Sequence, residues 1–165
     1  MSRKTQRKTS LRDHAWGGVL GLIFVAFVAT WFLGGRIAGA GGSTICEKPL
    51  SPLPGGTEIT AAGFAAEDSS LTQVINFLYA GDRARADDTF YGPVHSFMHN
   101  ADPVVRASNP EAAKALCQTV IQLENHLAAG TEVENITVGQ DTTAVQTALR
   151  DAAVALGLPR PGESP

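Results

Sequence analysis

The stretch NPEAAKALCQTVIQLENHLAAG, from Asn109 to Gly130, decides the fold class of this chain. Asn109 is a favoured N-cap residue, Pro110 fits the first helical turn, and Gly130 is a typical stop signal. The apolar residues between them recur at intervals of three and four, as in the buried stripe of an amphipathic helix. They are Ala113, Leu116, Val120, Leu123 and Leu127. The stretch therefore predicts a helix that packs in a bundle.

Two segments that precede this helix show the same period. The first begins near Ser70, where Ser70 and Gln73 have the spacing of a capping box, and it stops at Gly81. The second covers residues 86–101, and Pro93 either delays its start or kinks it. Their apolar stripes are Leu71, Val74, Ile75 and Leu78 in the first, and Val94, Phe97, Met98 and Ala101 in the second.

One further helix is expected after the helix that ends at Gly130. Residues 142–156 form the fourth expected helix, and residues 131–138 alternate weakly enough to be either a short strand or a loop. The expected fold is therefore all-α: a small bundle of about four helices in residues 58–158, followed by a frayed tail at 159–165. The stripes are narrow and rich in alanine, so this core is thin.

The N-terminal part predicts a membrane anchor. Residues 15–34 carry no charge and are apolar all round, and a helix of that length spans about 30 Å, the thickness of a bilayer core. We expect a basic cytoplasmic tail at 1–14, a transmembrane helix at 15–35 and a Gly/Pro-rich stalk at 36–57. An alternative is a signal peptide cut after Ala40, although the apolar run is longer than usual for one.

Charge fixes the expected orientation. The tail has a net charge of +4, whereas the part from residue 37 onward has −8. Lys and Arg accumulate on the cytoplasmic side, so the helical domain should lie outside a cell (plasma or inner) membrane, as in a bacterial signal-anchor protein. An acidic domain repels phosphate backbones, so we expect the lipid bilayer and other proteins as partners and no nucleic acid.

Small residues in the apolar run indicate a helix-packing surface. Gly17 and Gly21 form a G-x-x-x-G pair, which lets two membrane helices approach closely. The partner would be another subunit's transmembrane helix or a second copy in a homo-oligomer. Glycine is also simply frequent in membrane helices, and this alternative stays open.

Cys46 and Cys117 are the only cysteines, and both fall on the expected outer side. Outer compartments are usually oxidising, so we predict a disulfide between them. The alternative is a buried Cys117 and a free Cys46. Because a C-x-x-C motif is absent, the pair indicates a structural role and no redox catalysis.

The sequence VHSFMHN contains the one candidate for cofactor chemistry. His95 and His99 stand at i and i+4, which stacks both rings on one helix face, as a two-histidine metal site requires. Met98 would suit a soft ion, and Glu124 or His126 could add a ligand. Ser96 replaces the glutamate of H-E-x-x-H proteases. The alternative is two boundary histidines with no metal, and thus no cofactor.

Known catalytic motifs are absent, so we expect no independent enzyme. The first functional hypothesis is a single-pass, membrane-anchored accessory or interaction subunit of a larger envelope or membrane protein complex. The second is an extracytoplasmic metal-binding protein that uses the His95-x-x-x-His99 pair for Cu, Zn or Fe.

Overall fold

A computed structural model describes residues 44–163 of the 165-residue chain. The predicted transmembrane helix at 15–35, the basic tail, and Gly17 and Gly21 lie outside the described residues. Within the described part, no helix has the length and apolar character needed to cross a membrane.

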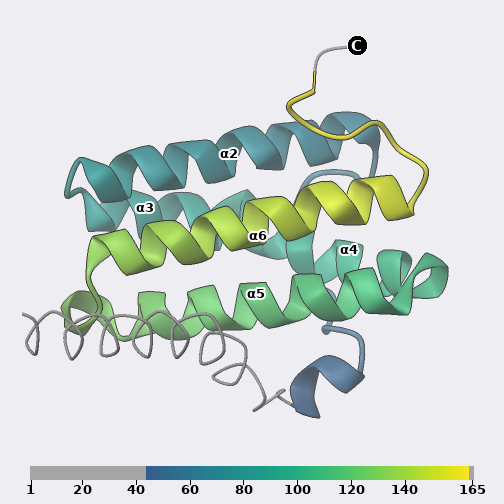
Figure 1. Ribbon diagram of the computed structural model, residues 1–165, viewed down its shortest axis with the longest axis horizontal. Coiled ribbons are helices and arrows are strands. Elements are labelled where there is room, and N and C mark those ends of the chain that lie inside the picture. Colours follow the sequence, from purple (N-terminus) through teal and green to yellow (C-terminus); the bar gives the residue numbers. More distant parts are fainter. Residues whose placement is uncertain (1–43, 164–165) are drawn as a thin grey trace, which may run out of the picture. The chain divides into compact units, whose positions relative to one another are not determined.

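Helices make up all the regular structure of residues 44–163, and no strand occurs there, which confirms the all-α prediction. The main helices are α2 (Ala61–Tyr79), α3 (Arg83–Thr89), α4 (His95–Ser108), α5 (Pro110–Ala128) and α6 (Asn135–Ala155). Short helical segments are η1 (Thr44–Glu47), η2 (Phe90–Val94) and η3 (Gly130–Glu132). In Figure 1, α6 lies between α2 and α5 and contacts both, while α4 packs against α5.

Helix α5 forms as the sequence predicts. The Asn109 side chain accepts a hydrogen bond from the Ala112 backbone N–H at 3.1 Å, and Pro110 is the first helical residue. All five residues of the predicted stripe are buried. Gly130 follows the helix with φ +62°, a left-handed conformation that favours glycine. The capping residues and the spacing of the apolar residues predict the same helix here, and the prediction is confirmed.

Helix α2 begins nine residues earlier than predicted, and the capping box at Ser70 was wrong. The N-cap is Thr60, whose side chain accepts from the Gly63 N–H at 3.2 Å. Ser70 lies inside the helix, where its hydroxyl donates to the Ala66 carbonyl at 3.1 Å. The alanine-rich first turns have a weak apolar period, so Phe64, packed edge-on against Phe97 at 5.0 Å, was missed as a core residue.

Helices α3 and α4 form one kinked unit joined through η2. Of the two alternatives predicted for Pro93, a late start or a kink, the structure has the kink: Gly92 before it has non-helical backbone angles (φ −75°, ψ −126°). The predicted stripe of α4 is fully buried, but the helix continues through Pro103 to Ser108, beyond the predicted end at residue 101.

Helix α6 is longer than the predicted 142–156. It begins at Asn135, so the weakly alternating residues 131–138 become η3 and the first turn of α6, with no strand. After the helix, Arg160 forms an ion pair with Asp151 at 2.8 Å, and Pro161 is buried, where we expected a frayed tail.

Residues 46–57, here called the strap, belong to the described part of the expected stalk. From residue 49 the strap has no regular secondary structure, but it does not stand free: Cys46 and Leu50 are buried against Cys117. The Asn100 side chain accepts from the Leu53 N–H at 2.9 Å and donates to the Gly55 carbonyl at 3.0 Å. The strap therefore lies along α4.

Candidate functional site: a histidine–carboxylate cluster

Helix α4 presents His95 and His99 on one face, as the i, i+4 spacing predicts. Their ring centroids are 4.5 Å apart. The kink at Gly92 and Pro93 directly precedes His95, so both histidines occupy the first two turns of α4. The geometry of the helix thus places two imidazole rings side by side on the same face of α4.

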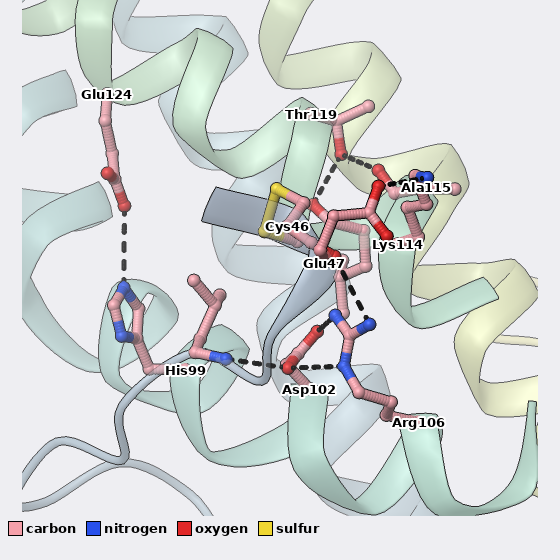
Figure 2. Close-up of a disulfide and its surroundings, with 12 residues drawn as sticks. Cys46, Glu47, His99, Asp102, Arg106, Lys114, Ala115, Thr119 and Glu124 are labelled. Carbon is pink, nitrogen blue, oxygen red and sulfur yellow. Dashed lines mark hydrogen bonds and ion pairs between the residues drawn. A yellow bond between two sulfur atoms is a disulfide. The ribbon is translucent and has the colours of Figure 1, made fainter. Parts of the chain in front are cut away.

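Glu124 of α5 completes the cluster from the neighbouring helix. Its Oε1 lies 2.8 Å from His95 Nε2 and 3.6 Å from His99 Nε2. Figure 2 shows the Glu124 side chain extending toward His99. One donor atom from each residue falls within a set whose members are all within 4.8 Å of one another. Among the described residues, this is the one group of three or more His, Cys, Asp or Glu residues arranged to hold a metal ion.

The cluster is partly buried. The side chains of His95, His99 and Glu124 keep 20%, 16% and 26% of their surface exposed. Part of each side chain is therefore in contact with solvent, while its partial burial leaves the charges less screened than those of fully exposed groups.

The strap fixes the protonation pattern of His99. His99 Nδ1 lies 2.9 Å from the backbone carbonyl of Ser51. A carbonyl oxygen only accepts hydrogen bonds, so Nδ1 carries the proton and donates it. In neutral His99 the lone pair is therefore on Nε2, the nitrogen that faces Glu124. Metal-binding histidines commonly have such a carbonyl or carboxylate partner on the nitrogen away from the metal.

Tyr91 borders the cluster on the side of His95. Its ring centroid lies 5.4 Å from that of His95, and its hydroxyl donates to the Glu124 backbone carbonyl at 3.5 Å. Burial, together with the negative charges of Glu124 and Asp87, raises the pKa of the Tyr91 phenol above its ordinary value. Tyr91 is thus a neutral hydrogen-bond donor at physiological pH.

Two of the other residues considered as ligands do not join the cluster. Met98 is fully buried in the hydrophobic core, because its position on α4 is turned about 100° from that of His99. His126 faces α6, where its Nδ1 lies 2.5 Å from Asp141 Oδ2; Gln122 donates to the other oxygen of Asp141 at 2.6 Å. The His126–Asp141 pair connects α5 to α6.

The predicted disulfide is present between Cys46 and Cys117, whose Cα atoms are 5.7 Å apart. It joins η1 to α5, and both residues are fully buried together with Leu50. Figure 2 shows this bond in the same view as His99 and Asp102.

An ion pair missed by the sequence analysis secures the strap. The side chain of Asp102 is fully buried, and its Oδ1 accepts from Arg106 Nη2 at 2.8 Å. Its Oδ2 accepts from the Leu50 backbone N–H at 2.8 Å, and Arg106 also donates to the Cys46 carbonyl at 3.3 Å (Figure 2). An i, i+4 Asp–Arg pair looks like an ordinary surface pair in the sequence, and only the position of the strap makes it a buried anchor.

Comparisons with known proteins give no family for this chain: no family model matches it, and neither a curated protein nor a solved structure does. Its functional interpretation therefore depends on the site geometry and the sequence.

Proposed function

We propose that this protein is a membrane-anchored, non-catalytic metal-binding protein whose helical domain holds a divalent transition-metal ion outside the membrane. The ligands are His95 Nε2, His99 Nε2 and the Glu124 carboxylate. The single observation that supports this function is the convergence of these three donors from two helices, all within 4.8 Å of one another.

The donor set favours Zn²⁺. Zinc binds histidine nitrogen and carboxylate oxygen at about 2.0–2.2 Å in tetrahedral geometry, which places neighbouring donors about 3.3 Å apart. The observed separations from Glu124 Oε1 to the two Nε2 atoms, 2.8 and 3.6 Å, lie on either side of that value. Metal binding would replace the hydrogen bond between His95 Nε2 and Glu124 Oε1 by coordination of both atoms to the ion. Two nitrogens and one oxygen also suit Cu²⁺ and Fe²⁺, whereas soft Cu⁺ prefers sulfur ligands.

A three-residue site leaves a fourth position for water or a ligand from a partner. In zinc hydrolases such a water is activated by a nearby glutamate base. The corresponding position in this motif is Ser96, which cannot serve as that base. This difference supports metal storage, transfer or structural use over hydrolysis.

The location outside a membrane is part of the same proposal. It is supported by the uncharged run at 15–34, the five Lys/Arg residues that precede it and the acidic composition after it. The Cys46–Cys117 disulfide is consistent with an oxidising compartment.

Metal binding by the full chain in detergent micelles tests the proposal. We expect one equivalent of Zn²⁺ per chain, and Co²⁺ in its place should give the visible absorption of a tetrahedral complex. Glu124→Gln and the double variant His95→Ala/His99→Ala should lose this equivalent. His126→Ala removes a histidine outside the cluster and is the matched control. No bound metal in the wild type, or equal binding in all four proteins, would refute the site.

A second candidate function is an accessory or interaction subunit of a larger membrane protein complex. It is supported by Gly17 and Gly21 in the uncharged run and by large apolar side chains exposed on the described domain. These are Ile45, Tyr79, Tyr91, Val104, Ile136 and Val154. Gentle detergent solubilisation followed by size analysis tests it. A discrete complex that Gly17→Leu/Gly21→Leu disrupts supports this function, and a lone monomer without a co-purifying protein counts against it.

A further inference from the structure

The strap connects the disulfide to the histidine cluster over a short length of chain. Ser51, whose carbonyl accepts from His99 Nδ1, is only five residues beyond Cys46. Between them, the Leu50 N–H donates to the buried carboxylate of Asp102 at 2.8 Å. Asp102 lies one turn after His99 on α4, so the strap bonds to two successive turns of the helix that carries the histidines.

We infer that the Cys46–Cys117 disulfide controls the metal affinity of the His95–His99–Glu124 site by holding the Ser51 carbonyl on His99. This inference rests on the proposed metal-binding function. The disulfide keeps the strap at α5, the strap keeps Ser51 at α4, and the Ser51 carbonyl keeps the proton of His99 on Nδ1. The metal then meets a histidine whose Nε2 already has a free lone pair and a fixed ring orientation.

The strap segment from Cys46 to Ser51 is attached to a helix at each end. Cys117 is on α5, the same helix as Glu124, whereas Ser51 contacts α4. The covalent bond therefore links the helix that supplies the carboxylate to the segment that orients an imidazole of the other helix. Burial of Cys46, Leu50 and Cys117 in one small cluster makes the strap rigid near the bond.

Reduction of the Cys46–Cys117 disulfide removes the covalent link between the strap and α5. A dithiol reductant supplies two electrons and two protons, Cys46 and Cys117 become thiols, and the reductant leaves as its own disulfide. The strap then keeps its non-covalent contacts, which include the hydrogen bonds to Asp102, Asn100 and His99, the bond from Arg106 to the Cys46 carbonyl, and the small apolar cluster. Conformations with Ser51 away from His99 become more populated, and in these His99 exchanges its proton between both nitrogens and rotates.

The reduced state therefore binds metal more weakly than the oxidised state. Loss of an outer hydrogen-bond partner of a metal-binding histidine typically lowers affinity by about 10- to 100-fold. By linkage, a bound metal protects the disulfide against reduction by the same factor. The site would hold its ion in an oxidising compartment and release it to a reducing partner.

The test compares Zn²⁺ dissociation constants, measured by competition with a chromophoric chelator, for full chains in detergent micelles. The wild type is compared with Cys46→Ser/Cys117→Ser, which mimics the opened bond without adding thiols that bind zinc themselves. We expect the variant to bind at least about 10-fold more weakly. Asn100→Ala, which keeps the disulfide but releases Leu53 and Gly55, should also weaken binding, and it tests whether the position of the strap sets the affinity.

A control variant distinguishes a lost orientation of His99 from a general loss of stability of the domain. Arg150→Gln breaks the bond from Arg150 to Asp68, which joins α6 to α2 away from the strap. It should lower thermal stability without changing the zinc dissociation constant. If the wild type binds zinc and both strap variants bind it with the same affinity, the role of the disulfide is refuted. The metal site itself is then unaffected. A wild type that binds no zinc instead overturns the proposed function itself.

Discussion

The buried carboxylate of Asp102 in α4 accepts the backbone N–H of Leu50 at 2.8 Å, across 52 residues of sequence. The same carboxylate accepts from Arg106, which itself donates to the Cys46 carbonyl. One fully buried acidic side chain thus holds both a cation of its own helix and the segment that enters the bundle. Near Cys46 the strap is thus attached by Asp102, Arg106 and the disulfide, and farther along it by three hydrogen bonds to the Asn100 side chain.

Asp102→Ala should therefore destabilise the domain by about 3 kcal/mol, because it leaves Arg106 and the Leu50 N–H without their common partner in a dry environment. Urea unfolding followed by circular dichroism measures this change. The control is Glu47→Gln, which breaks an exposed ion pair with Lys114 and should have a much smaller effect, because solvent screens exposed pairs. Equal effects of the two substitutions would show that the Asp102 contacts do not anchor the strap.

Gly63→Ala should destabilise the first turn of α2. A Cβ at this position would lie 1.9 Å from the Glu58 backbone carbonyl oxygen, so either the helix or the preceding turn must move. We expect a loss of about 1–3 kcal/mol.

The matched control is Gly139→Ala in α6. Its Cβ would meet only the Tyr79 ring at ordinary contact distances of 3.7 Å and more. Alanine is the better helix former, so this variant should be stabilised by about 0.5–1 kcal/mol. Thermal unfolding of both variants checks the pair, and a tolerated Gly63→Ala would contradict the close approach at Glu58.

Glu67→Met should stabilise the domain at neutral pH. Glu67 is 2% exposed, and its Oε2 has no hydrogen-bond partner among the described residues, while its Oε1 accepts from the Thr57 hydroxyl. Replacing a poorly satisfied buried carboxylate by an apolar side chain of similar size removes a desolvation penalty, and we expect a gain of about 1 kcal/mol. Denaturant unfolding measures it. A clear loss of stability would mean that the bond from Thr57 outweighs that penalty.

The ion pair between Glu47 and Lys114 should make a small contribution to stability that is lost in acid. The hydrogen bond from Lys114 at 2.6 Å, and then its charge, lower the pKa of Glu47 below its ordinary value of 4.5. A lowered folded-state pKa stabilises the domain above the unfolded pKa, and this contribution is lost as pH falls through the folded pKa. Wild type and Lys114→Gln should therefore differ at pH 6 and converge in acid, as the pH falls through the lowered pKa of Glu47. A difference that persists undiminished in acid would exclude this ion pair as its source.

Some features of the fold could be predicted because their causes are local. The cap, the first-turn proline and the stripe of α5 are all encoded within 22 residues, so this helix was correct from Asn109 to Gly130. The start of α2 was wrong because Thr60 caps a run of small residues that become helical through packing, above all the contact of Phe64 with Phe97.

The candidate site was predictable only in part. The spacing of His95 and His99 identified one face of one helix. Glu124, 29 residues from His95, was considered as a ligand but could not be distinguished from His126, because a helical period does not say which face meets α4. Met98 was included because it adjoins the histidines, yet its side chain enters the core. A sequence gives neighbours along one helix reliably and neighbours across two helices poorly.

The sequence by itself determined the helical class, the period of each buried stripe, the spacing of the two histidines and the presence of two cysteines suited to a disulfide. These properties depend on interactions within a few residues or on composition. Only the tertiary structure decided that α4 packs on α5 so that Glu124 meets both histidines, and that the strap places Ser51 on His99. These arrangements arise from burying several stripes at once, and the packing of complete side chains sets the rotation and register of each helix.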